Sequence, residues 1–155
     1  MSGLFALPLG AREHRSFDRG WLFTLSDSTE MYQPSYADGH WRRLNLPHDW
    51  AIEGDFSPSN PSGASGGALP GGIGWYRKHF SLSPDEKYDR FTITFDGVYM
   101  NSTVYINGHK LGTRPYGYST FEYDLTPYIY KKGDNVIAVK VDNSDQPNSR
   151  WYSGC

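Results

Sequence analysis

The chain has 155 residues, which is enough for one domain with a single hydrophobic core. Its formal net charge is −2, and acidic and basic residues alternate without forming the basic stripe of a nucleic-acid-binding face. No segment approaches the roughly 20 apolar residues that a membrane helix needs, so neither a nucleic acid nor a membrane is expected as a partner. The apolar stretch 4–9 is interrupted by Pro8 and lacks the basic start and the length of a signal peptide.

Aromatic residues make up 16% of the chain, which also contains 17 glycines and 10 prolines. This composition favours an all-β fold with frequent turns. Aromatic rings suit the core of a sandwich, their usual place, and they also suit the apolar faces of sugar rings. The single cysteine is Cys155, so the sequence excludes an intrachain disulfide and a metal site built from cysteines.

In the first half of the chain, strands are expected at residues 21–25, 41–46 and 75–82. In the third of these strands the alternation is interrupted by Lys78. Between the second and third strands lies a segment rich in glycine, proline and serine, residues 57–74. Such a segment is either an interdomain linker or a long loop, and the strand signals on both sides favour a loop within one domain.

In the second half, strands are expected at residues 90–98, 102–106, 121–125 and 135–141. The dipeptide Asn107-Gly108 predicts a hairpin turn, because both residues tolerate positive φ angles. Helix is expected only as single turns at 84–87 and 126–129. These elements predict an all-β fold, an antiparallel β-sandwich of the jelly-roll type.

Two patterns invite a catalytic or metal-binding interpretation, and neither is favoured. His48 and Asp49 are adjacent, so in an extended chain they point in opposite directions, and a turn with Asp49 as a cap is expected instead. Residues 142–153 begin like a calcium loop, but Pro147 stands where the loop needs glycine, and Ser153 replaces the final glutamate. We therefore expect no metal ligands.

The polar segment 142–152 can also be interpreted as a loop that faces a sugar. Asn143, Asn148 and Arg150 supply donors and acceptors suited to neighbouring hydroxyl groups, and Trp151 and Tyr152 supply flat apolar surfaces. A polar loop anchored by a buried tryptophan explains the same residues equally well. The side-chain chemistry leaves both interpretations open.

Five strings, in this order along the chain, resemble the N-terminal sugar-binding domain of family 2 glycoside hydrolases, and bacterial β-galactosidase-like members in particular. They are LPHDW (46–50), GWYRKHF (74–80), FDGVYMNSTVYINGHKLG (95–112), PYGYSTFEYDLTPYI (115–129) and VDNSDQPNSRWYSG (141–154). The resemblance implies a jelly-roll domain over residues 20–155, preceded by an N-terminal extension at 1–19. It fits the bacterial cytoplasm or periplasm and does not distinguish between them.

The resemblance also implies a role. In this family the jelly-roll domain is followed by an immunoglobulin-like domain and a catalytic barrel, and it contributes a loop to the rim of the barrel's substrate pocket. Carried over to this chain, that loop places Asn148 nearest to the sugar hydroxyls, with Arg150 and Trp151 supporting it. The family also places the FDGVY segment near the pocket, which brings Tyr99 or Asn101 there. No cofactor and no catalytic residue is expected in this chain, which alone should not hydrolyse glycosides.

Two alternatives to this role are a stand-alone carbohydrate-binding module and a purely structural or oligomerisation module. The family pattern continues after the WYSG string with a further strand, whereas this sequence stops at Cys155. The sequence therefore predicts a fragment with an unpaired sheet edge that is marginally stable or self-associating. Nothing in the sequence fixes the preferred sugar, since galactose, glucuronic acid and mannose enzymes share this domain.

Overall fold

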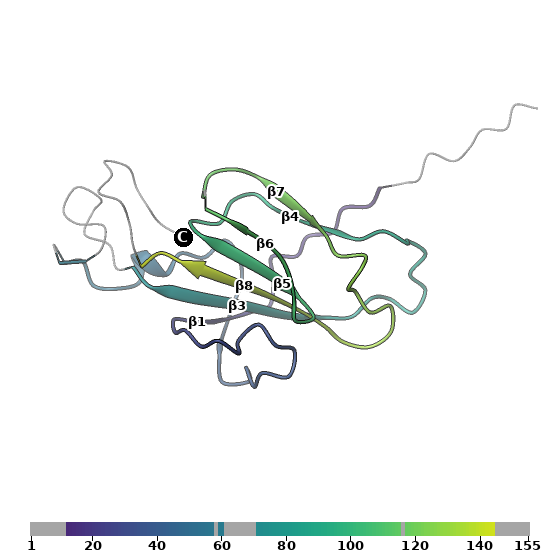
Figure 1. The fold of residues 1–155 in the computed structure, drawn as a ribbon, viewed down its shortest axis with the longest axis horizontal. Coiled ribbons are helices and arrows are strands. Elements are labelled where there is room, and N and C mark those ends of the chain that lie inside the picture. The colour runs from purple at the N-terminus through teal and green to yellow at the C-terminus, as the bar shows by residue number, and fades with distance from the viewer. Residues whose placement is uncertain (1–11, 58, 61–70, 116, 145–155) are drawn as a thin grey trace, which may run out of the picture.

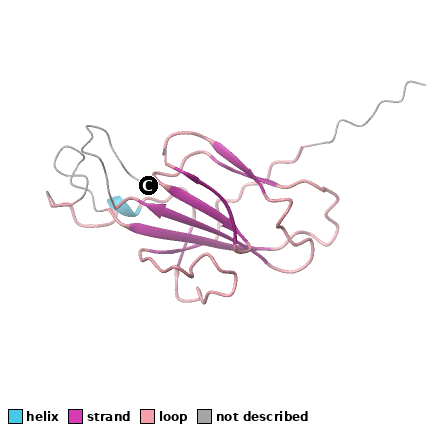
Figure 2. Ribbon diagram, in the orientation of Figure 1, coloured by secondary structure: helices cyan, strands magenta, loops and turns pink. Residues whose placement is uncertain are grey.

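The computed structural model describes residues 12–57, 59–60, 71–115 and 117–144. Strands dominate it, and the helix among the described residues is one 3-10 turn, η1 (Trp50–Ile52), shown in Figure 2. The strands, all paired antiparallel, are β1 (Trp21–Thr24), β2 (Arg42–Leu44), β3 (Ile73–Phe80), β4 (Thr92–Phe95), β5 (Ser102–Ile106), β6 (His109–Arg114), β7 (Phe121–Asp124) and β8 (Asn135–Asp142). No helix in these ranges is long and apolar enough to cross a membrane.

The strands form two layers, as expected for a jelly-roll sandwich. The larger sheet has the order β2-β1-β3-β8-β5-β6, and β4 pairs with β7 in a second, two-stranded sheet. Figure 1 shows β4 and β7 lying over the sheet that contains β5, β8 and β3. β3 and β8 are the long central strands, paired from Ile73↔Asp142 to Phe80↔Asn135. Their two ends therefore define the two ends of the domain.

The main core lies between the two sheets. Every second residue of β8, namely Ile137, Val139 and Val141, points into it, because strand side chains alternate between faces. β5 contributes Val104 and Ile106 by the same alternation. The sequence predicts that Val104 and Ile106 share one face, as do Ile137, Val139 and Val141, and their common place in this core confirms it. Aromatic side chains from the other strands complete the core, among them Trp21, Phe23, Trp50, Tyr76 and Phe121.

The outer face of the large sheet is covered as well, by the loop that joins β1 to β2. Met31 and Trp41 from this loop pack with Trp75 and Ala138 on the sheet and form a second buried cluster. In Figure 1 this loop lies on the opposite side of the sheet from β4 and β7. Because both of its faces are covered, β8 reads as a nearly continuous apolar run and not as an alternating one.

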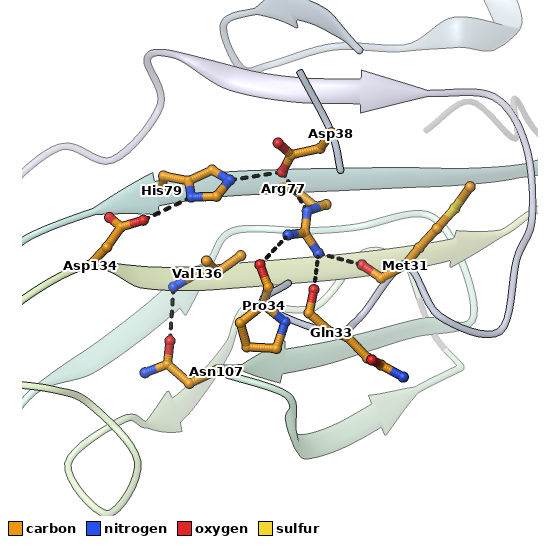
Figure 3. A network of polar contacts seen from close by, with 9 residues as sticks. All are labelled: Met31, Gln33, Pro34, Asp38, Arg77, His79, Asn107, Asp134 and Val136. Carbon is orange, nitrogen blue, oxygen red and sulfur yellow. Dashed lines mark hydrogen bonds and ion pairs between the residues drawn. The ribbon is translucent and has the colours of Figure 1, made fainter. Parts of the chain in front are cut away.

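Arg77 on β3 holds this loop on the sheet, and its side chain is fully buried. Its Nε donates to Oδ2 of Asp38 at 2.6 Å, and its terminal nitrogens donate to the carbonyl oxygens of Met31 (2.6 Å), Gln33 (2.8 Å) and Pro34 (3.4 Å), as Figure 3 shows. A buried charge is tolerated only when it is paired and its remaining donors are satisfied. One guanidinium thus fixes the path of a loop that has no regular hydrogen-bond ladder.

Lys78, the next residue, lies on the core side of β3, where the sequence pattern is interrupted. Its Nζ donates to the carbonyl oxygens of Phe17 (2.9 Å) and Arg19 (2.7 Å) and lies 3.9 Å from the centre of the Phe17 ring. Burial lowers the pKa of this amine. The charged end therefore reaches the border of the core and bonds to the segment before β1, while its apolar stem packs inside.

The observed strands are mostly shorter than the predicted ones at their ends, and three further differences concern whole segments or the start of a strand. The segment after Asn107-Gly108 forms the full strand β6, which the sequence marks only through its turn. β3 begins at Ile73, so the last two residues of the expected 57–74 loop belong to a strand. The two predicted helical turns are hydrogen-bonded turns without helix assignment, with Glu86 N donating to the Ser83 carbonyl and Ile129 N to the Leu125 carbonyl.

Replacing Arg77 with methionine should destabilise the domain by about 3–5 kcal/mol, because Asp38 and several carbonyl groups then lose their buried partner. Urea unfolding of the purified chain measures this. The matched control is Arg43→Met on β2, where the side chain is exposed, and a change within about 0.5 kcal/mol is expected. Equal effects of the two substitutions would contradict the structural role of Arg77.

Candidate functional site

The candidate site lies where β8 ends and β5 begins. The backbone N–H of Asp142 donates to the carbonyl of Met100 at 3.2 Å, and the side-chain amide of Asn101 donates to the carbonyl of Asp142 at 3.3 Å. The pairing of β5 with β8 begins directly beside this contact, with Ser102 opposite Val141. The segment that contains Tyr99 and Asn101 is thus attached to the carboxyl end of β8.

A second loop reaches the same end of the sheet. Asn143 is fully buried, and its backbone N–H donates to the carbonyl of Gly72 at 2.8 Å. Helix η1 is close by, because a Cβ atom on Gly74 would come within 2.7 Å of the Trp50 ring. Figure 1 shows η1 and the arrowhead of β8 at the same end of the molecule. The structure therefore brings the end of the glycine-rich loop next to the predicted sugar-facing segment.

The backbone of Asn101 is held in a left-handed conformation, with φ of 48°. Asparagine adopts this region more readily than most residues with a side chain. Its backbone N–H also approaches the carbonyl of Pro115 at 3.5 Å, so a third loop joins the group. Asn101 consequently contacts two neighbouring segments while it turns the chain into β5.

Tyr99 packs against this third loop, and two glycines, Gly97 and Gly117, make the close approach possible. The rings of Tyr99 and Tyr118 have centroids 5.5 Å apart, and the Tyr118 side chain is 74% exposed. A Cβ atom on Gly117 would lie 2.3 Å from Cδ2 of Tyr99, and one on Gly97 would lie 2.9 Å from the Gly117 carbonyl oxygen. The absence of side chains at both glycines lets the two loops interlock, and an aromatic pair results at the surface.

Gly117→Ala should therefore destabilise the domain by about 1–3 kcal/mol, the usual effect of forcing extra atoms into a tight contact. The new methyl group has to displace the Tyr99 ring and the backbone beside Asn101. Urea unfolding measures the loss, and the near-ultraviolet circular dichroism of the tyrosines reports the displacement. Gly39→Ala is the control, since a Cβ atom there meets nothing within 4 Å. A stability loss no larger than that of the control would refute the interlock.

Of the five predicted site residues, Tyr99 and Asn101 lie in this region, adjacent to the end of β8. Asn148, Arg150 and Trp151 lie outside the described residues. The described part of their segment, 142–144, leaves β8 beside Asn101. Their approach to Tyr99 and Asn101 therefore stays a prediction.

The expectation that His48 and Asp49 form a turn and not a catalytic pair is confirmed. The carboxylate of Asp49 accepts from the backbone N–H of Ala51 at 2.9 Å and caps η1. The nitrogens of the His48 ring face elsewhere, with Nδ1 2.8 Å from the hydroxyl of Tyr76 and Nε2 3.2 Å from a terminal nitrogen of Arg42. His48 thereby connects the loop after β2 to the core.

Four of the five glutamates make ion pairs with arginines. These pairs are Glu13 and Glu86 with Arg15, Glu53 with Arg42, and Glu122 with Arg12. A general acid in glycoside hydrolysis needs a raised pKa, whereas the hydrogen bond from Arg15 lowers the pKa of Glu13. The hydrogen bonds from Arg42 lower the pKa of Glu53 to about 2 against the opposing effect of burial. These glutamates therefore act as ion-pair partners of arginines.

Glu53 should make the free energy of unfolding depend on pH in the acidic range. Its pKa is depressed below the usual 4.5, so its contribution is present above pH 4.5 and is lost as the pH falls through about 2. Urea midpoints measured from pH 5 to pH 3 should fall less for Glu53→Gln than for the wild type. Glu30→Gln, at an exposed position, is the matched control. A Glu53→Gln variant with the wild-type slope would exclude this linkage.

Within the described ranges, no group of three or more histidine, cysteine or acidic side chains is arranged to hold a metal ion. The structure also shows two features that sequence reasoning missed, the buried Arg77 and the interlocked glycines Gly97 and Gly117. An arginine between Tyr76 and Lys78 in a strand carries little signal of burial. The strings YGY (116–118) and DGV (96–98) do not show on their own that Gly117 and Gly97 meet.

Comparison with known proteins adds the family. The family model described as "Glycosyl hydrolases family 2, sugar binding domain" matches residues 14–154. The chain is 62% identical over 144 residues to a β-galactosidase, BoGH2A, of Bacteroides ovatus, a match that covers 93% of this chain. It is 47% identical over 144 residues to a putative β-glucuronidase of Formosa agariphila.

Among solved structures, a β-glycosidase from Bacteroides vulgatus matches with a TM-score of 0.84 and 50% sequence identity, over 89% of this chain and 18% of that one. A β-glucuronidase from Bacteroides uniformis matches with a TM-score of 0.72 and 26% identity. The chain spans 17% of the Bacteroides ovatus protein and 14% of the Formosa agariphila protein. The similarity therefore concerns one part of much longer proteins.

Proposed function

Because this chain belongs to the sugar-binding domain family of the family 2 glycosyl hydrolases, we propose that it serves as the non-catalytic N-terminal domain of a longer retaining glycosidase. That enzyme hydrolyses terminal β-galactosides or related β-glycosides. The 62% identity to a protein named as a β-galactosidase supports galactosides. The relatives named as β-glucuronidases are less similar, at 47% identity and below.

We assign residues 20–155 to this domain and residues 1–19 to an extension before it. The domain packs on a catalytic barrel and an immunoglobulin-like domain in the longer enzyme. The interior of the sandwich is filled by aromatic and aliphatic side chains, so a sugar has to bind at the surface. The end of the domain where Tyr99, Asn101 and residues 142–144 converge is the surface directed at the barrel.

The observation that carries this proposal is the pair of hydrogen bonds that joins Met100 and Asn101 to Asp142. They fix the start of segment 142–154 relative to Tyr99. From there, Asn148 hydrogen-bonds the sugar hydroxyls, and Arg150 and Trp151 support the loop. The tyrosine pair forms an apolar border next to these polar groups, the combination that sugar rings require.

The decisive substitution is Asn148→Ala in the full-length enzyme. Losing a buried partner of a substrate hydroxyl should reduce kcat/KM for an aryl β-galactoside by the equivalent of about 2–4 kcal/mol. Steady-state kinetics with the galactoside and with the matching glucuronide give the size of the effect and the preferred sugar. Removing the substrate hydroxyl that Asn148 contacts should have little further effect in the variant.

Lys132→Ala is the control, because this exposed lysine lies in the turn before β8, at the opposite end of the sheet. Its kcat/KM should equal that of the wild type. If Asn148→Ala is equally active, the domain is structural and contributes nothing to the pocket. If the isolated chain binds galactosides in a calorimetric titration and Asn148→Ala removes that binding, it is a stand-alone carbohydrate-binding module.

A further inference from the structure

His79 lies between two carboxylates at the other end of the sheet. It follows Arg77 by two residues on β3, so both side chains point to the outer face. Its Nε2 is 2.8 Å from Oδ2 of Asp38, in the loop between β1 and β2, and its Nδ1 is 3.0 Å from Oδ2 of Asp134, in the turn before β8. Figure 3 shows the ring bridging these two side chains.

The chemistry of the bridge depends on one proton. An ionised carboxylate only accepts hydrogen bonds, and a neutral imidazole has a single N–H to donate. Both contacts of His79 are therefore hydrogen bonds only when the ring carries a proton on each nitrogen. We propose that His79 is a proton-operated clamp: protonated, it joins the β1–β2 loop to the turn at residues 133–134, and on losing its proton it releases that turn.

The two carboxylates differ in how firmly they are held. The Asp38 side chain is 11% exposed, and the same Oδ2 atom accepts from Arg77 at 2.6 Å. The Asp134 side chain is 59% exposed. When the ring becomes neutral, it keeps its remaining proton on the nitrogen that faces the buried Asp38. The lone pair of the other nitrogen then faces a carboxylate, so the contact with Asp134 is the one that opens.

Hydrogen bonds at the start of β8 limit the movement to the turn. The Asn135 side chain accepts from Tyr130 N at 2.7 Å and from the amide of Asn107 at 2.8 Å. The backbone N–H of Val136 donates to Asn107 at 2.9 Å. β8 therefore stays paired from its first residue, and the movement is limited to residues 131–134.

The charges around His79 favour its protonated form. Among the described residues, the charged groups that contact the ring are Asp38 and Asp134. Arg77 influences the ring through Asp38, which both side chains contact. Burial of the ring opposes protonation, but the hydrogen bonds to Asp134 and Asp38 outweigh it and raise the pKa of His79 above its usual 6.5. The clamp is consequently closed in mildly acidic solution and opens as the pH rises through this raised pKa.

The direct test is a proton NMR titration of the His79 ring in the 155-residue chain, with the signal assigned by its loss in His79→Gln. The wild-type ring should titrate above 6.5, and Asp134→Asn should move its pKa down toward that value. The matched control is Asp89→Asn, which removes another exposed carboxylate, one that pairs with Lys131. It should leave the titration of His79 unchanged.

A second measurement tests whether the turn is released when His79 loses its proton. Between pH 6 and pH 8, the backbone NMR order parameters of residues 131–134 should fall, and this fall should be absent in His79→Gln and in Asp134→Asn. Stability follows the same sign, because a raised pKa contributes at low pH and the contribution is lost as the pH rises. A His79 ring that titrates at or below 6.5, or an Asp134→Asn variant that leaves its pKa unchanged, would overturn the proposal. So would order parameters of the turn that stay the same between pH 6 and pH 8.

Discussion

The buried guanidinium of Arg77 is the interaction on which the arrangement of this domain depends. The large sheet is apolar on both faces, and no second sheet among the described residues covers its outer face. A loop without its own hydrogen-bond ladder covers that face instead, and Arg77 binds three of its carbonyl oxygens and its one buried carboxylate. Because a buried charge without partners is so unfavourable, the loop and the strand have to adopt this one arrangement together.

The same strand connects the two ends of the domain. At the amino-terminal end of β3, the carbonyl of Gly72 accepts from the backbone N–H of Asn143, and Gly74 pairs with Val141 near the end of β8. Toward its carboxyl end, Arg77 and His79 share the carboxylate of Asp38. The domain thus has an end with the Tyr99–Tyr118 aromatic pair, for which we propose the role at the sugar pocket, and an opposite end with His79 between two carboxylates. The buried strands between them keep the two ends at a fixed distance.

Much of the fold could be predicted because its signals are local. Apolar residues at every second position of 102–106 indicate which face of that strand is buried, and Asn107-Gly108 indicates its own backbone conformation. The strand β6 was missed because its residues, His109–Arg114, are mostly exposed and polar, so no alternation marks it. It forms because the hairpin turn brings it alongside β5, a tertiary consequence of a local signal.

The sequence by itself determined that this is an all-β domain, which strands carry the core, and, through five ordered strings, the family to which it belongs. Only the tertiary structure decided that Asn101 meets Asp142, that Gly117 admits the Tyr99 ring, and that Asp38 lies between Arg77 and His79. Each of these contacts joins residues far apart in the chain or in different loops. The spacing of apolar residues along a sequence shows which side chains of one strand share a face. Whether two loops meet depends on how the strands between them pair and twist.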